Sequence, residues 1–270
     1  LADFDRAIEL DPQFAWVIGA RGETYRLMER YNQALADFDR AIELDPQYAW
    51  VIGARGETYR LMARHDAALY GKALVDFDRA IDINPQYTWA LVCRGETCRL
   101  IGQYQAALVD FDRAIELNSK YAWAIASRGL VRHAQKQYDA ALVDFDRAIE
   151  IDPKLAWLVT ARGETYRLMA RHDAALTDKA LADFDQAIEL DPRATWAIGN
   201  RARVYRDLRR YDTALADFNR IPEVEPDEEW AFYHQAIIRR VLNPASDWRR
   251  NLEQAIEHAR ATYEQSPANQ

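Results

Sequence analysis

Tryptophan, glutamate and arginine recur together at a fixed spacing along this chain. Trp16 is followed by Glu23 and Arg26, and on a helix that turns about 100° per residue Trp16 and Glu23 point only about 20° apart. Tryptophan and arginine are the side chains that most often dominate binding free energy at protein interfaces. The pattern therefore predicts a surface for non-covalent binding. The candidate residues are Trp16, Gly19, Glu23, Arg26, Trp50, Gly53, Glu57, Arg60, Trp89, Glu96, Arg99, Trp123, Trp157, Glu164, Arg167, Trp196, Arg206 and Trp230.

Two interpretations of the tryptophans stay open at this point. In the first, Gly19, Gly53 and Gly199 leave hollows beside the indoles that a side chain of a partner fills. In the second, each indole packs along the molecule against the next helix and has a structural role.

The remaining reactive residues form no catalytic or metal-binding pattern. The chain has no glycine-rich phosphate loop, no His-Glu-x-x-His and no paired-cysteine spacing for a metal. Cys93 and Cys98 would point about 140° apart on a helix, which suits two reduced thiols. His65 and His172 stand where other repeats have tyrosine, so we expect them to pack as tyrosine substitutes. The sequence predicts no enzyme, no cofactor and no metal.

Composition narrows the classes of partner. The net charge of −8 argues against a protein that neutralises nucleic-acid phosphates. No window approaches about 18 uninterrupted apolar residues, so no membrane span is expected. Together with the thiols, these features predict a cytoplasmic protein. The chain opens at Leu1 inside a helical pattern and without methionine, which predicts a piece of a longer protein.

The elements that position the candidate residues are repeats. The segment from Leu35 to Pro46 recurs, and Pro12 and Pro46 stand 34 residues apart, whereas Pro46 and Pro85 stand 39 apart because five residues are added. The predicted division is 1–11 as the second helix of a truncated repeat, six repeats at 12–45, 46–84, 85–118, 119–152, 153–191 and 192–225, and a degenerate repeat with a C-terminal cap at 226–270; repeats 46–84 and 153–191 carry the five-residue insertions.

The pattern of each repeat predicts two helices. Ala34, Phe38, Ala41 and Ile42 have the spacing of one apolar helical stripe, with Asp37, Asp39, Arg40 and Glu43 expected to face water. This is the second helix, and Pro46 ends it. The first helix runs from about Ala15 to Met28, where Gly22 permits close approach of its partner helix.

The 34-residue period resembles the tetratricopeptide repeat. Gly22 and Tyr25 in the first helix and the series Ala34, Phe38, Ala41 and Pro46 match its pattern, although the usual large aromatic near the start of the first helix is Ile18 here. The resemblance implies an all-α, right-handed superhelical solenoid of antiparallel helix pairs. It also implies that the tryptophan-bearing face of the first helices lines a concave groove for extended peptides.

The function that this resemblance implies is a protein–protein interaction scaffold or sensor module that binds a protein or peptide in the concave groove. The glutamates predict a partner with basic and apolar residues. A self-assembly (oligomerisation) module and an accessory domain of a larger signalling ATPase or enzyme are the alternatives. Self-association is expected through the N-terminal edge, because Leu1, Phe4 and Ile8 belong to a second helix whose first helix is absent.

Overall fold

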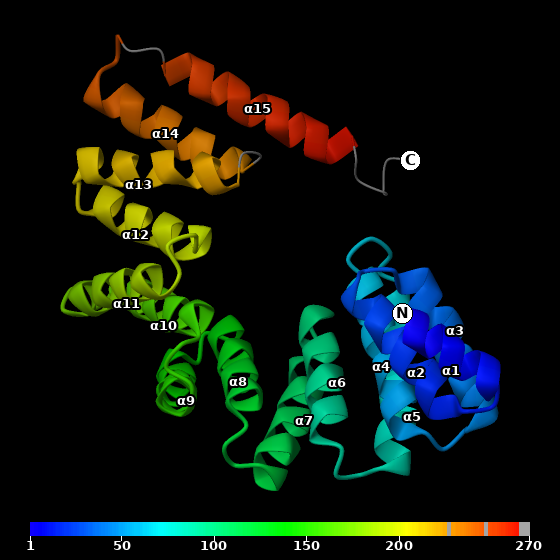
Figure 1. Cartoon of the computed structure of the whole chain (residues 1–270). Helices are drawn as coiled ribbons and strands as arrows, with labels where there is room; N and C mark the ends of the chain where they lie inside the picture. Colours follow the sequence, from blue (N-terminus) through cyan, green and yellow to red (C-terminus); the bar gives the residue numbers. More distant parts are fainter. Residues whose placement is uncertain (226–227, 246–247, 265–270) are drawn as a thin grey trace. The chain divides into compact units, whose positions relative to one another are not determined.

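The computed structural model describes residues 1–225, 228–245 and 248–264. Within those ranges the chain forms fifteen α-helices and no strand (Figure 1). The expected all-α fold of consecutive helix pairs is confirmed. The helices belong to two compact units, Leu1–Val131 and Arg132–Gln270.

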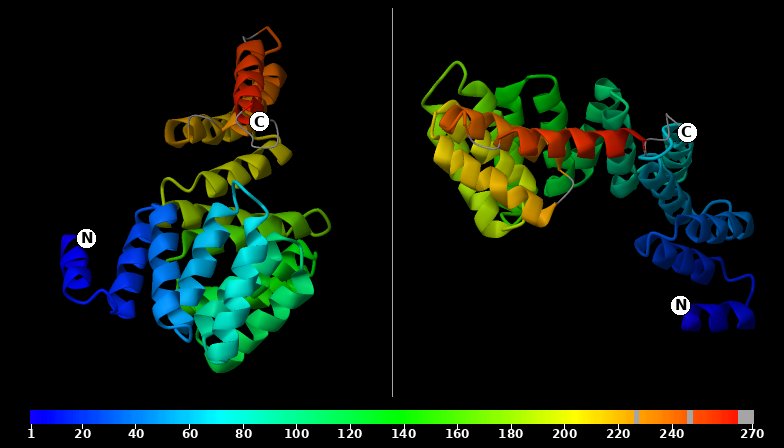
Figure 2. Two further views of the ribbon diagram at one scale, coloured as in Figure 1. Left: turned by 90° about the vertical axis from the view of Figure 1, so that its right-hand side faces the viewer. Right: turned by 90° about the horizontal axis from the view of Figure 1, so that it is seen from above.

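The first unit contains seven helices and most of an eighth. They are α1 (Ala2–Leu10), α2 (Ala15–Leu27), α3 (Tyr31–Leu44), α4 (Ala49–Met62), α5 (Leu69–Ile83), α6 (Thr88–Leu100), α7 (Tyr104–Leu117) and α8 (Ala122–Ala134). The pairs α2–α3, α4–α5 and α6–α7 pack along their lengths, and each pair also contacts the next. Figure 2 shows the same row from two further directions, with α1 at its end.

The last turn of α8 begins the second unit. It continues with α9 (Tyr138–Ile151), α10 (Ala156–Met169), α11 (Leu176–Leu190), α12 (Thr195–Asp207), α13 (Tyr211–Val224), α14 (Glu229–Leu242) and α15 (Trp248–Glu264). Here α10–α11, α12–α13 and α14–α15 are the closely packed pairs. Pro226, the expected start of the degenerate repeat with its C-terminal cap, lies outside the described residues.

Phenylalanine and glycine make the centre of each pair. The second helices bury Phe38, Phe77 and Phe111 completely in the first unit. A Cβ added to Gly95 would lie 2.7 Å from Cε1 of Phe111, and one added to Gly22 would lie 2.9 Å from Phe38. The expected close approach at Gly22 is thus confirmed, and only glycine permits it.

The expectation that Asp37 faces water is wrong. Asp37 is buried, and its two carboxylate oxygens accept hydrogen bonds from Nε and Nη2 of Arg21 at 2.8 and 2.7 Å. Nη1 of Arg21 also donates to Asp5 of the preceding helix, α1, at 2.8 Å. The apolar pattern missed this because a buried carboxylate needs a charged partner, and the partner of Asp37 lies on another helix. The same triads are Arg55 with Asp76 and Asp39, Arg94 with Asp110 and Asp78, Arg162 with Asp183 and Asp146, and Arg201 with Asp217 and Asp185.

The five-residue insertions lengthen the turn between the helices of a pair. Three residues, 28–30, join α2 to α3, whereas six, 63–68, join α4 to α5, and each of the two inserted pairs also gains one residue in each helix. The segment 170–175 between α10 and α11 has the same length. His65 and His172 lie exposed in these turns, so our expectation that they pack in place of tyrosine is wrong.

Among the described residues, no helix has both the length and the apolarity to cross a bilayer.

Candidate functional site

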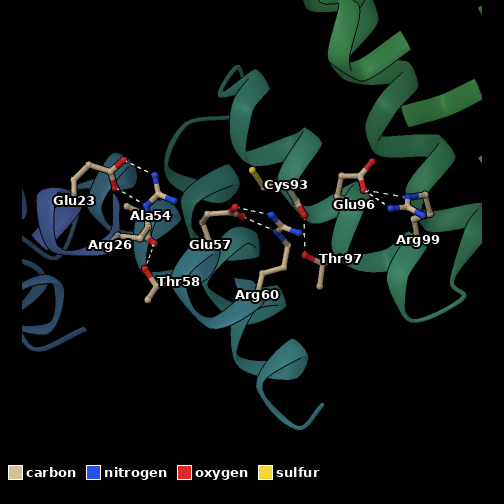
Figure 3. A network of polar contacts seen from close by, with 10 residues as sticks. All are labelled: Glu23, Arg26, Ala54, Glu57, Thr58, Arg60, Cys93, Glu96, Thr97 and Arg99. Carbon is tan, nitrogen blue, oxygen red and sulfur yellow. Dashed lines mark hydrogen bonds and ion pairs between the residues drawn. The ribbon is translucent and has the colours of Figure 1, made fainter. Parts of the chain in front are cut away.

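The glutamates and arginines of the candidate surface pair with one another within each first helix. Nε and Nη2 of Arg26 donate to the two carboxylate oxygens of Glu23 at 2.8 and 2.6 Å. Figure 3 shows this pair on α2 and its counterparts on α4 and α6. The counterparts are Glu57 with Arg60, at 2.7 and 2.6 Å, and Glu96 with Arg99, at 3.0 and 2.9 Å to one carboxylate oxygen. We call the face that carries these residues and the tryptophans the first-helix face.

Because these glutamates and arginines pair with one another, little unpaired charge is left on the first-helix face. The hydrogen bonds from Arg26 to Glu23 raise the pKa of the Arg26 guanidinium, against the opposing effect of burial. Glu57 and Glu96 are themselves buried. The sequence predicted that these glutamates attract basic residues of a partner, but the three-residue spacing places an arginine of the same helix within reach of each one.

Cys93 lies buried beside this network. Burial, with the neighbouring carboxylates of Glu57 and Glu96 adding to it, raises the pKa of the Cys93 thiol well above its ordinary value. A thiol held in its protonated form is a poor nucleophile and a poor metal ligand. Cys93 and Cys98 are both free thiols in this structure.

Gly19 and Gly53 leave no open hollows, so the prediction of hollows is wrong for these two glycines. A Cβ on Gly19 would lie 3.1 Å from Cζ3 of Trp50 in the following repeat, and one on Gly53 would lie 3.1 Å from Cζ3 of Trp89. The indole of Trp230 fills the corresponding space beside Gly199. Each glycine therefore receives the tryptophan of the next repeat, which is the structural interpretation.

Other contacts give the same role to further indoles. Trp89 and Trp123 pack against the buried cluster of Ala73, Phe77 and Cys93. The ring of Trp89 meets the edge of Phe77 at 6.5 Å between centroids. These two tryptophans, together with Trp50 and Trp230, are part of the packing between repeats.

Three tryptophans expose more than a third of their surface to solvent. Trp16 is 54%, Trp157 37% and Trp196 46% exposed. Trp16 is in the first repeat that has a first helix. Trp196 lies in α12. In the preceding first helix, α10, Thr160 stands at the position of Gly19. Without a glycine there, the helix offers the indole no such seat.

The second unit departs from the ladder of ion pairs. Nε and Nη2 of Arg167 donate to Glu164 at 2.6 and 2.7 Å, as in the first unit. In the next repeat Arg203 stands where glutamate is expected, and Arg206 bonds instead to Asp207 at 2.9 Å. Arg203 was missing from our candidate residues. Comparing residue types at one repeat position would have found it, since a glutamate becomes an arginine there.

His234, in α14, lies against this arginine cluster. Its Nδ1 is 3.4 Å from Nη1 of Arg206, and its ring stacks on Phe218 at 4.9 Å between centroids. Burial, assisted by the charges of Arg206 and Arg203, lowers the pKa of His234 to about 4. The imidazole is therefore neutral near pH 7.

In the described ranges, no group of three or more histidine, cysteine, aspartate or glutamate residues could hold a metal ion. What the first-helix face offers is indole surface, paired charges and, in the second unit, arginines without glutamate partners.

The comparisons with known proteins agree with the fold. The family model described as tetratricopeptide repeat matches residues 15–48 and 122–155. No curated protein sequence matches the chain. The crystal structure of YrrB, described as a tetratricopeptide-repeat protein with an unusual peptide-binding site, is 26% identical over 72% of this chain and 95% of its own, with a TM-score of 0.53.

Two further solved structures resemble it in fold. A tetratricopeptide-repeat protein from Parabacteroides merdae is 19% identical over 87% of this chain and 89% of its own, with a TM-score of 0.67. MamA is 23% identical over 66% of this chain and 92% of its own, with a TM-score of 0.52. The family model identifies residues 15–48 and 122–155 as tetratricopeptide repeats, and helix pairs of the same kind recur in both halves of the chain.

Proposed function

We propose that this protein is an interaction scaffold that binds an extended segment of a partner protein on its first-helix face. The observation that carries the proposal is the exposure of Trp157 and Trp196 in consecutive first helices of the second unit. The equivalent Trp50, Trp89, Trp123 and Trp230 are seated against glycine or the core, whereas these two have indole surface left for a ligand. Large exposed aromatic side chains mark binding surfaces.

The peptide-binding site ascribed to YrrB supports the same kind of ligand here, because the two chains share the fold and 26% of their residues over most of their lengths. The pairing of Glu23, Glu57 and Glu96 with arginines leaves little free negative charge in the first unit. We therefore propose that apolar residues of the partner carry the affinity there, and that basic residues contribute less than the glutamates alone suggested.

The test is a library of terminally blocked peptides screened against the intact chain, with binding followed by indole fluorescence. We expect Trp157→Ala combined with Trp196→Ala to weaken binding at least about thirtyfold, as the loss of an interface hot spot does. Its melting temperature should stay close to that of the unaltered chain. Trp50→Ala is the matched control: it should lower the melting temperature, because Trp50 is seated on Gly19. Unchanged peptide binding by the double variant would contradict the proposal.

Self-association through α1 is a second candidate. Phe4 and Ile8 are only partly buried, and within the first unit α1 packs mainly against α2. Sedimentation at high concentration should detect a dimer that Phe4→Asp abolishes; a monomer at all concentrations rejects it. The role as an accessory domain of a larger signalling ATPase or enzyme stays a prediction, as does the cytoplasmic location.

A further inference from the structure

A cavity of about 350 Å³ lies in the second unit between α12 and the start of α14. Trp196 and Trp230 provide its aromatic lining, and Asn200 and Arg203 its hydrogen-bond donors. Glu225 and Glu228 also line it. The cavity is thus part of the first-helix face, with apolar walls and groups of both charges.

Asn200 has a donor without an acceptor. The residue is 1% exposed, and its Nδ2 atom is buried with no hydrogen-bond partner. Its Oδ1 faces Nη1 of Arg203 at 3.4 Å, which fixes the orientation of the amide. A buried N–H without an acceptor costs about 1–3 kcal/mol. The equivalent residues Ala20, Ala54 and Ala161 avoid that cost.

Arg203 has no carboxylate partner among the described residues. It lies over the ring of Trp230, 5.4 Å from the centroid, and its other contact is Asn200. Burial, together with the charges of Arg167 and Arg206, lowers the pKa of its guanidinium. An anion at this place would satisfy both the guanidinium and the amide N–H of Asn200.

The two glutamates of the cavity do not fill this role. Glu225 accepts a hydrogen bond from Oγ1 of Thr195 at 2.9 Å, and burial with the hydrogen bond to Glu225 raises the pKa of Glu228. Thr195 and Arg203 are eight residues apart, about 12 Å along the helix. The glutamates therefore repel an anion from the far end of the cavity and leave the Arg203 end as the favourable place.

We propose that this cavity receives an aspartate or glutamate side chain of the partner peptide, which accepts hydrogen bonds from Asn200 and Arg203 while an adjoining apolar residue lies against Trp196. The inference rests on the proposed peptide binding and specifies the residue that the second unit selects. A carboxylate fits the donors better than a neutral amide, because hydrogen bonds between charged groups are the stronger ones.

The test uses the intact chain and blocked pentapeptides of alanine, leucine and phenylalanine around a central glutamate, glutamine or lysine. We expect the glutamate peptide to bind at least about tenfold more tightly than the glutamine peptide, the ratio for one charge-assisted hydrogen bond. A glutamine peptide with a free carboxyl terminus should not recover this affinity. If it binds as well as the glutamate peptide, the site recognises a chain terminus and the proposal fails.

Two variants are matched to residues that other repeats already carry. Arg203→Glu should keep the melting temperature, because it recreates the pair formed by Glu164 and Arg167, and should abolish the preference for the glutamate peptide over the glutamine peptide. Asn200→Ala reproduces Ala161. This variant should raise the melting temperature and still lower the affinity for the glutamate peptide about tenfold. Unchanged binding by Asn200→Ala overturns the inference.

The two proposals fail separately. If glutamate and glutamine peptides bind equally, and replacing Trp157 and Trp196 weakens both, only the acidic preference is wrong. If no blocked peptide binds at all, the proposed function and this inference are both overturned.

Discussion

The guanidinium of Arg55 donates from Nε and Nη2 to the carboxylate of Asp76 on the paired second helix, at 2.8 and 2.6 Å. The Asp76 side chain is only 5% exposed, whereas Asp39, which Arg55 contacts at 2.7 Å in the preceding repeat, is 52% exposed. One arginine thus makes a buried and an exposed ion pair at the same time.

Asp76→Asn should be far more damaging than Asp39→Asn. Removing the buried partner leaves Arg55 without its main counter-charge, which costs about 3–5 kcal/mol, whereas an exposed pair contributes about 0–1 kcal/mol. Melting temperatures of the two variants measure the difference. Equal effects would mean that the buried pair contributes no more than the exposed one.

Gly95→Ala should lower the free energy of unfolding by about 1–3 kcal/mol, because overpacking forces side chains away from their rotamers. The added methyl group would lie 2.7 Å from the ring of Phe111. Gly71→Ala is the control on a neighbouring helix of the same unit, since nothing lies within 4 Å of the added Cβ. It should stabilise the protein by up to about 1 kcal/mol. Urea unfolding distinguishes the two, and stabilisation by Gly95→Ala would contradict the packing described at Phe111.

The turn between paired helices predicts a stabilising substitution. Lys136 has φ 60° and Gly102, at the equivalent place, has φ 78°. A left-handed conformation costs a non-glycine residue about 1–2 kcal/mol, so Lys136→Gly should raise the melting temperature and Gly102→Ala should lower it. Circular dichroism melts of both variants test this. A lower melting temperature for Lys136→Gly would show that the Lys136 side chain stabilises the turn by more than its strain costs.

Acid should destabilise the second unit through His234. The folded protein holds the pKa of His234 at about 4, below its ordinary value of 6.5, so the unfolded chain takes up the proton first. The resulting stability is fully present above pH 6.5 and is lost as the pH falls toward 4. His234→Phe keeps the ring against Phe218 and should reduce the drop in melting temperature between pH 7 and pH 5.

His65→Gln serves as the control, because it replaces an exposed imidazole and should leave that drop unchanged. An identical drop for His234→Phe and the unaltered chain would exclude His234 as the group responsible.

Much of the fold could be predicted because the repeat supplied the same apolar stripe several times over. Phe38 and Gly22 were placed correctly for that reason, since burial of apolar residues follows helical spacing. The buried state of Asp37 could not be read in this way, because it depends on Arg21 from another helix. A pattern along one helix contains no information about a partner sixteen residues away.

The candidate site was predicted less completely. The face was identified by the angle between Trp16 and Glu23, but the helix wheel does not show which side chains of adjacent repeats touch. Trp50 was therefore placed in a groove although it is seated on Gly19. Arg203 was missed because the candidate residues were those that recur from repeat to repeat, and Arg203 replaces the recurring glutamate.

The triad of Arg55 with Asp76 and Asp39 bears on how such a chain can grow. Each repeat between residues 12 and 191 brings one arginine, one aspartate for that arginine, and one aspartate for the arginine of the repeat that follows. A whole repeat inserted between two others therefore finds an acceptor behind it and supplies one ahead, and no buried charge is left unmatched. Cutting within a repeat breaks that matching. The hydrogen bonds thus make the entire repeat, rather than the helix, the smallest length by which this protein can be extended or shortened without electrostatic cost.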